Sequence, residues 1–451
     1  MPAPTTLLTP RAKLQRLARV NRHDLPERPS RRSRVALAAV VGACGLSLTA
    51  GLSLSFGQGG DPPLPGRTSY PAISGGEWSR GPNLKDADGN FQPRQEHAAV
   101  ELNGFVYLIG GFVPNPDAPK PSENEPEPFP FMPTGEVQVY TPSGHPTAPA
   151  AEQGEWSVLP EASSFPRSNR HHIVAVNHQG KIWAFGGHAG VFAPTPEVFV
   201  FTPSSPAAAA GRWSKARVGD GSACTGDGRD CLALPRSRSA GAAVSIGYRI
   251  YLVGGVEPNP RPRDPVNETI RSTASVLYLD TASFPLRWRS APSLRERREH
   301  FNAVVAGGRL YVFHGRNERS THLASVESWK PGERRWRRHQ DAPAGTSANI
   351  LAAVGDCVYS FGGEFIATNV TGTVNASQVF HVPTGTWRRL RTRTRTRPLD
   401  GAGAISKHGT YGVPFREDGV ARIMAPGGAP TAWFDPSSKV HVFTPPARCA
   451  S

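Results

Sequence analysis

The sequence predicts an all-β repeat protein, and two observations carry this prediction. An apolar run that ends in Gly-Gly, or once in His-Gly, recurs at residues 105–111, 182–187, 250–255, 310–315 and 358–363, with a weaker copy at 410–413. The composition of 47 Gly and 45 Pro among 451 residues, with 38% hydrophobic residues, favours many short strands joined by turns over helical bundles. Recurrence at a period of roughly 40–80 residues is typical of repeat architectures, so most of the chain is expected to form one repeat domain.

Each repeating unit contains four predicted strands. A strand of small and β-branched residues comes first, the Gly-Gly strand second, a strand of alternating apolar residues third, and a strand opened by tryptophan fourth. Glycine permits the positive φ that a turn after the second strand requires, and tryptophan supplies a large apolar body to pack between units. The first strands are expected at 97–100, 172–176, 242–244, 302–305, 351–354 and 401–405, the third strands at 137–142, 198–203, 276–280, 326–331, 379–383 and 440–445, and the tryptophans are Trp156, Trp213, Trp288, Trp336 and Trp387.

This order of strands resembles the kelch repeat, and the resemblance covers residues 76–445. It implies an all-β fold, a six-bladed β-propeller of the kelch type with four antiparallel strands in each blade. It also implies that arginines and small polar residues around one mouth of the central channel bind a partner, either a protein or an anionic glycan.

The tryptophan strand of the sixth unit is expected to come from the N-terminal side of the repeats. No tryptophan strand follows residue 445, whereas Glu77-Trp78-Ser79 matches Glu155-Trp156-Ser157 and has no other strands of a unit before it. We therefore expect the segment around Trp78 to pair with residues 440–443 and to close the ring, which removes exposed sheet edges. Long inserts between second and third strands are expected at 112–135, 256–273 and 414–438.

The N-terminal part of the chain predicts export. Residues 1–34 form a basic segment expected in the cytoplasm, residues 35–56 an uncharged transmembrane or signal segment, residues 57–75 a linker, residues 76–446 the propeller and residues 447–451 a tail. The propeller is therefore expected outside the cytoplasm, either membrane-anchored or secreted. Cleavage of the apolar segment, its retention, and lipidation of Cys44 all stay open.

The cysteines predict at most one local disulfide. Cys224 and Cys231 flank a short polar loop and could pair in an oxidising compartment. Cys357 is expected to be a small core residue and Cys449 part of the tail. The chain has no Cys-x-x-Cys motif, so no metal site and no cofactor are predicted.

Polar residues that lead into the first strands are the candidate ligand-binding residues. Residues two apart in a strand share a face, so these pairs are expected to converge on one mouth and to favour an anionic ligand. An equally strong alternative is that each arginine pairs with a neighbouring carboxylate for structure alone. The adjacent His171 and His172 are expected on opposite faces of a strand, which argues against joint metal ligation. The candidates are Arg94 and Glu96, Arg170 and His172, Arg236 and Arg238, Arg298 and His300, Ser347 and Asn349, and Asp400, and the rim of the channel is expected to include His188, Glu257, Arg316 and Glu364.

The sequence predicts a binding module in preference to an enzyme. It contains no phosphate loop, no Gly-x-Ser-x-Gly elbow and no His-Glu-x-x-His motif, so no catalytic residues are assigned. The net charge of +15 comes without a nucleic-acid-binding motif, and no nucleic-acid partner is expected. The alternative is a carbohydrate-active enzyme of the acidic-sugar epimerase or mutarotase kind, with Glu96, Glu299 or Glu364 as the base. It requires at least one of these carboxylates to face the channel.

Overall fold

The computed structural model describes residues 70–118, 130–190, 193–224, 228–263, 269–318, 321–367, 370–394, 407, 409–431 and 435–449. The chain divides into two compact units, residues 1–59 with 262–269, and residues 60–261 with 270–451. The second unit holds almost all of the described residues. The predicted segments 1–34 and 35–56 lie outside the described residues, within which no helix is both long and apolar enough to cross a membrane.

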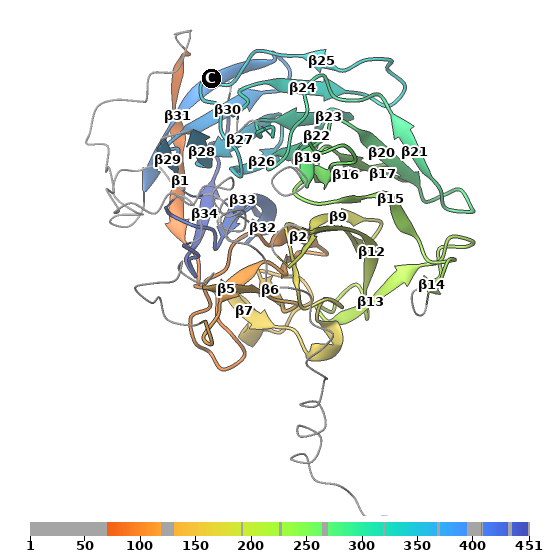
Figure 1. Cartoon of the computed structure of the whole chain (residues 1–451). Helices are drawn as coiled ribbons and strands as arrows, with labels where there is room; N and C mark the ends of the chain where they lie inside the picture. The colour runs from red at the N-terminus through yellow and green to blue at the C-terminus, as the bar shows by residue number, and fades with distance from the viewer. Residues whose placement is uncertain are drawn as a thin grey trace, which may run out of the picture. The chain divides into compact units, whose positions relative to one another are not determined.

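The second unit is a β-propeller of six blades arranged around a centre (Figure 1). Each blade consists of four sequential antiparallel strands, except that the last blade takes its fourth strand from the N-terminal side. The strands of blades one to three are β2 (Ala98–Leu102), β3 (Phe105–Ile109), β6 (Val137–Thr141) and β7 (Glu155–Val158); β9 (Val174–His178), β10 (Lys181–Phe185), β12 (Ala193–Pro203) and β13 (Gly211–Ala216); and β16 (Ala242–Ile246), β17 (Arg249–Val253), β20 (Val276–Asp280) and β21 (Trp288–Ala291).

Blades four to six follow the same plan. Their strands are β22 (Asn302–Ala306), β23 (Arg309–Phe313), β24 (Val326–Trp329) and β25 (Arg337–Arg338); β26 (Ile350–Val354), β27 (Cys357–Phe361), β30 (Ser377–His381) and β31 (Thr386–Thr394); and β32 (Val413–Glu417), β33 (Val420–Pro426), β34 (Val440–Thr444) and β1 (Ala72–Arg80). Outside the blades lie the 3₁₀ turns η1 (Ala150–Glu152) and η2 (Glu161–Ser163), together with the short strands β14 (Ala223–Cys224), which pairs with β13, and β15 (Ala233–Arg238), which pairs with β12.

The first strands of the six blades line a central channel. Strands β2, β9, β16, β22, β26 and β32 contact one another in this order, and β32 contacts β2 to complete the circle. Mostly small apolar side chains of these strands surround a channel volume of about 400 Å³, with Glu101, Asn177 and Ser245 among the few polar side chains. Since each first strand begins beside the channel, the residues that precede these strands are brought together at one mouth.

The predicted ring closure is confirmed. β1 pairs with β34 in antiparallel register, with Trp78 opposite Phe443, and it also pairs in parallel with β31 of blade five (Figure 1). Trp78 is fully buried between Phe361 of blade five and Phe443 of blade six, with ring centroids 4.8 and 5.0 Å apart. β1 therefore completes the last blade and also joins it to the blade before.

The prediction for blade six was wrong in its register. Its second strand is β33 rather than residues 410–413, and the glycine pair that follows is Gly427-Gly428, both with positive φ. The first strand is β32 rather than residues 401–405, which lie outside the described residues. The stretch 414–438 is consequently not one long insert, because it contains most of β32 and all of β33.

Two disulfides cross-link the described part of the propeller. Cys224 and Cys231 are bonded as expected, with Cα atoms 5.6 Å apart. Cys357 is a buried core residue, as expected, but it is also bonded to Cys449, 92 residues later, across a Cα distance of 6.3 Å, which the sequence did not predict. This second bond ties β27 of blade five to the segment after β34 of blade six, at the place where the ring closes.

Candidate functional site

A closed ring of backbone hydrogen bonds forms one mouth of the channel. One residue from each blade has a left-handed backbone, with φ between 47° and 66°. It lies two residues before the first strand in blades one to five and four residues before β32 in blade six. The amide of each donates to the carbonyl of its counterpart in the preceding blade, over N···O distances of 2.7–3.1 Å. The six ring residues are Glu96, His172, Ala240, His300, Ala348 and Gly409. A left-handed residue other than glycine is unfavourable by roughly 1–2 kcal/mol, so the closed ring holds five strained residues in place.

A second set of hydrogen bonds explains the recurring glycine pairs. The amide of the second glycine in every blade donates to a carbonyl that lies two residues before the ring residue of the next blade, for example Gly187 N to Arg238 O at 2.9 Å. At Gly186, a Cβ atom would lie only 1.8 Å from the same Arg238 oxygen. The glycines therefore permit a turn with positive φ, as predicted, and also the close approach of the next blade.

The arginines before the ring do not converge on the mouth, which corrects the prediction. Arg94, Arg238 and Arg298 are buried, at 0–1% exposure, and their guanidinium groups turn back into their own blades. Arg238 donates to Gly254 O at 2.6 Å, and Arg298 donates to His314 O at 2.7 Å and pairs with Glu327 at 2.8 Å. The left-handed ring residue interrupts the strand alternation, so that residues two apart no longer share a face.

The basic residues two positions before the ring residue in blades one, two and six also bind groups of the protein itself. Arg94 pairs with Glu136 and Arg170 with Glu197, while Lys407 of blade six donates to Gly427 O at 2.6 Å. Although burial acts in the opposite direction, hydrogen bonds from Arg167 and Arg170 lower the pKa of Glu197 below its usual value. The alternative stated for these arginines, a structural pairing with carboxylates, is therefore what the structure contains.

The other predicted positions have separate outcomes. Arg236 is largely exposed, 3.6 Å from Glu257, because the ring residue of blade three is Ala240 and the predicted pair was two residues out of register. Asn349 is buried and donates to Ser360 Oγ at 3.1 Å, because the ring position of blade five is Ala348. Asp400 lies outside the described residues.

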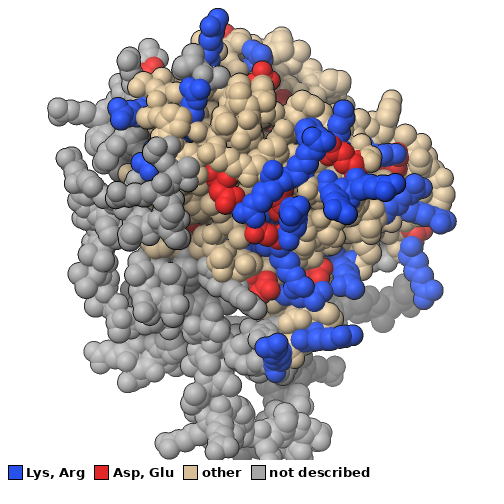
Figure 2. All heavy atoms as spheres, turned by 90° about the horizontal axis from the view of Figure 1, so that it is seen from above, with Lys and Arg blue, Asp and Glu red and all other residues tan. Residues whose placement is uncertain are grey.

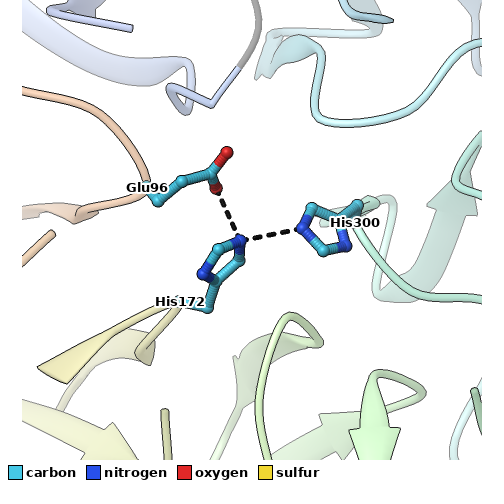
Figure 3. A group of neighbouring side chains, drawn as sticks. All are labelled: Glu96, His172 and His300. Carbon is cyan, nitrogen blue, oxygen red and sulfur yellow. Dashed lines mark hydrogen bonds and ion pairs between the residues drawn. The ribbon is translucent and has the colours of Figure 1, made fainter. Parts of the chain in front are cut away.

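Glu96, His172 and His300 do meet at the centre of the mouth (Figure 3). His172 Nε2 lies 2.9 Å from Glu96 Oε2 and 2.8 Å from His300 Nε2. The side chains of Glu96 and His172 are 7% and 6% exposed, and that of His300 is 12% exposed. Three different blades therefore supply one buried group of polar atoms.

The expected separation of His171 and His172 was wrong. Their Nδ1 atoms lie 2.5 Å apart, because the positive φ of His172 ends the strand and turns the second side chain toward the first. His188, predicted at the rim, packs against both rings with centroid distances of 5.3 and 5.5 Å. Burial, followed by the charges of His172 and His171, holds the pKa of His188 well below its usual value.

A chain of polar side chains extends from this centre toward blade five. His300 Nδ1 contacts Glu299, whose other oxygen accepts from Arg316 Nε at 2.8 Å, and Arg316 also pairs with Glu364. The mouth therefore carries one continuous network, Glu96–His172–His300–Glu299–Arg316–Glu364. The predicted rim positions Arg316 and Glu364 belong to it, whereas Glu257 pairs with Arg271 at 2.6 Å.

A crown of short β-structures stands on the mouth. In five blades, the residue that follows the Gly-Gly or His-Gly pair forms an antiparallel β-bridge with the residue just before the ring residue. Phe112 pairs with Gln95 in this way, and Glu364 pairs with Ser347. The crown consists of β4 (Phe112–Pro114) with β5 (Phe131–Pro133), β8 (Arg170–His171) with β11 (His188–Ala189), β18 (Val256–Pro258) with β19 (Ile270–Ser272), the bridge from Arg316 to His322, and β28 (Glu364–Ala367) with β29 (Val370–Thr373). The ends of two predicted inserts thus form part of a surface around the polar centre.

Two groups of side chains in the described residues have atoms close enough to ligate one metal ion. One is Glu96, His172 and His300, whose candidate ligand atoms all lie within 4.8 Å of one another. The other is Cys224, Asp230 and Cys231, whose sulfurs are already bonded to each other. The sequence had predicted no metal site because its motif search addressed thiolates and helical histidine pairs, whereas the first group is assembled from three blades.

Comparison with known proteins gives a consistent family assignment. The Kelch motif matches residues 297–338, which run from just before the ring residue of blade four to the end of β25. Kelch-like protein terF of Aspergillus terreus is 24% identical over 380 residues, which cover 82% of this chain and 68% of that protein. Alpha-scruin of Limulus polyphemus is 28% identical over 128 residues, and Kelch-like protein 38 of Rattus norvegicus is 22% identical over 172 residues. These two matches cover 13% and 27% of the lengths of the respective relatives.

Proposed function

We propose that this chain, which belongs to the kelch-repeat family, is an interaction module that works outside the cytoplasm and binds its partner on the crown around the mouth of its propeller. The observation that carries the proposal is the crown itself. Its members differ in length and sequence, although each is attached to the same ring of backbone hydrogen bonds. A rigid scaffold that holds variable loops around one polar centre is the usual arrangement of a recognition surface.

The two disulfides support a location outside the cytoplasm. Cys224–Cys231 and Cys357–Cys449 use all four cysteines of the described residues. Disulfides form and persist in oxidising compartments and are rare in the cytosol of most organisms. The uncharged segment at residues 35–56, preceded by a basic segment, supports the same proposal independently.

The exposed charge supports a partner with an acidic surface. Lys and Arg side chains gather on the face seen from above in Figure 2, with fewer acidic side chains among them. On the outer edge of blade four, near β25 at the top of Figure 1, the exposed arginines outnumber Glu333 and Asp341, with which two of them pair. They are Arg334, Arg335, Arg337 and Arg338. Such a surface speeds association with an acidic partner at low salt. The mouth itself has little to offer an anion, because its guanidinium groups are already paired with carboxylates.

Photocrosslinking from two exposed positions tests the docking surface. Met132 lies on β5 in the crown and is 41% exposed, and Tyr248, in the turn at the far end of β16, is 62% exposed. A benzophenone amino acid at either position of the full-length chain, irradiated in the cells that produce it, should give a discrete adduct from position 132 and none from position 248. Adducts from position 248 alone would refute docking on the crown. Alkylation of intact cells before lysis reports the location, because the cysteines of the two disulfides are expected to be oxidised. Free thiols at these four positions would contradict it.

One observation favours an enzymatic alternative. Glu299 and Glu364 pair with Arg316, but Glu96 turns toward the centre of the mouth and contacts His172. The condition set for a carbohydrate-active enzyme, an inward-facing carboxylate, is therefore met by one residue. Incubation of the full-length chain with sialic and uronic acids, followed by nuclear magnetic resonance of the anomers, tests this alternative. Acceleration that is lost in the Glu96→Gln variant supports it, and an unchanged anomer equilibration rate contradicts it.

A further inference from the structure

Three potential ligand atoms converge at the centre of the mouth. His172 Nε2 is 2.9 Å from Glu96 Oε2 and 2.8 Å from His300 Nε2, and the three side chains come from blades one, two and four (Figure 3). Each belongs to a left-handed ring residue whose backbone is held by hydrogen bonds to both neighbouring blades. The ring therefore fixes the backbone positions from which the three side chains extend.

The outer contacts of the two histidines favour a proton on Nδ1 of each ring. His171 Nε2 lies 2.7 Å from Gly190 O, a carbonyl that can only accept, so His171 Nδ1 is left as an acceptor for His172 Nδ1–H. His300 Nδ1 faces the Glu299 carboxylate, to which an Nδ1–H donates, and Arg316 Nη2 lies 3.4 Å from the same nitrogen. A proton on Nδ1 of both rings satisfies these outer contacts and leaves the Nε2 lone pairs pointing inward.

This arrangement directs three electron-pair donors at one another. Two imidazole nitrogens and a carboxylate oxygen in mutual contact are stabilised when a positive charge, a proton or a metal ion, lies among them. A metal ion bound at about 2.0–2.2 Å holds adjacent ligand atoms roughly 3.0–3.4 Å apart in octahedral or tetrahedral geometry, close to the two contacts observed. The polar network around the centre has three carboxylates and one guanidinium, so its acidic side chains outnumber its guanidinium group.

The surroundings match those of known metal ligands. A histidine that binds a metal almost always donates its other ring N–H to a carboxylate or a comparable acceptor, and His300 meets this condition through Glu299. Arg316 Nε holds Glu299 at 2.8 Å and thereby orients it. Two histidines and one carboxylate on one side of an ion, with further positions open, form the ligand set of catalytic zinc sites and of non-haem iron(II) sites.

We propose that Glu96 Oε2, His172 Nε2 and His300 Nε2 bind one divalent transition-metal ion, zinc(II) or a close neighbour in the first transition series, at the mouth of the channel. The remaining coordination positions face solvent or a carboxylate, carbonyl or hydroxyl of the docking partner. This site does not depend on the crown as a docking surface, and either proposal can fail without the other.

Metal titration of the full-length chain tests the site. After chelation and dialysis, zinc(II) binding is followed by isothermal titration calorimetry, and cobalt(II) binding by visible absorption. We expect one tight equivalent of each ion and cobalt bands of a four- or five-coordinate nitrogen and oxygen site. Glu96→Gln, His172→Asn and His300→Asn should each weaken zinc binding at least about 100-fold, since loss of outer-shell partners alone usually costs 10–100-fold. Asparagine tolerates the left-handed backbone of the two histidine positions.

A matched control separates this site from surface histidines. His381 lies at the opposite end of blade five, paired in register with Cys357, and His381→Asn should bind zinc as the parent chain does. No stoichiometric binding by the parent chain, or unchanged affinity in all three ligand variants, would overturn the proposal. If a histidine variant fails to fold, Glu96→Gln and the cobalt spectrum of the parent chain decide the question. A spectrum of octahedral hexaaqua cobalt would then count against the site.

Discussion

Removal of the Cys357–Cys449 disulfide should weaken the propeller where its ring closes. The bond joins β27 of blade five to the segment after β34 of blade six, and both cysteines lie in the core cluster that contains Trp78 and Phe443. The perturbation is the double variant Cys357→Ala/Cys449→Ala. Its matched control is Cys224→Ala/Cys231→Ala, which removes the other disulfide, a link between residues only 7 apart.

The expected magnitudes follow from the length of chain that each bond restrains. A cross-link across 92 residues lowers the entropy of the unfolded chain by an amount worth about 4.6 kcal/mol at 25 °C, and one across 7 residues by about 2.4 kcal/mol. The closure bond should therefore contribute about twice as much free energy of unfolding as the local bond, a difference of about 2 kcal/mol.

Equilibrium urea unfolding monitored by tryptophan fluorescence is the assay, because Trp78 is fully buried beside the closure bond. We expect the Cys357→Ala/Cys449→Ala midpoint to fall below that of the control, and reducing agent to bring the parent chain close to the quadruple alanine variant. Equal midpoints for the closure variant and the parent chain would refute the idea that this bond holds the ring shut.

Three further predictions concern stability. Trp78→Ala should lower the free energy of unfolding by about 3–5 kcal/mol, more than Trp288→Ala does at a half-buried position, and equal thermal shifts would contradict the role of Trp78 in closure. Gly186 and Gly247 have similar φ values of 60° and 58°, but only at Gly186 would a Cβ atom clash with backbone. In urea unfolding, Gly247→Ala should therefore lower the free energy of unfolding by about 1 kcal/mol, and Gly186→Ala should lower it by at least about 3 kcal/mol. Burial, aided by Arg298, lowers the pKa of His314 to about 3. The unfolded chain therefore takes up this proton first as pH falls through about 6.5, and about 2 kcal/mol of stability is lost between pH 7 and pH 5. His314→Asn should reduce that loss, and an unchanged pH dependence of the urea midpoint would contradict the assignment.

The strand pattern of blades one to five could be predicted from the sequence because local signals coincide there. Glycine pairs, tryptophans and apolar alternation all mark the same strands, and the unmatched Trp78 strand indicated how the ring closes. Blade six was misplaced because residues 401–405 imitate a first strand and Gly412-Val413 imitates a worn glycine pair. Counting forward to Gly427-Gly428 would have corrected the register.

The site could be predicted only in part, for a physical reason. Glu96, His172 and His300 were named, but strand alternation also placed their arginines at the mouth. A left-handed residue other than glycine leaves no local sign in a sequence, and it reverses which neighbouring side chains share a face. Long-range links such as Cys357–Cys449 have no local sign either. The three residues that end at each ring residue resemble one another between blades, as in Arg94-Gln95-Glu96 and Arg298-Glu299-His300. This similarity is the signal that could have located the ring.

The convergence of three blades on one polar centre is the claim on which the account of the mouth rests. A crystal structure of the full-length chain grown with zinc(II), with data collected on both sides of the zinc absorption edge, tests it most directly. We expect one strong anomalous peak bounded by Glu96, His172 and His300, at roughly 2.0–2.2 Å from each ligand atom. Side chains that point away from one another, with zinc bound elsewhere or not at all, would contradict the account.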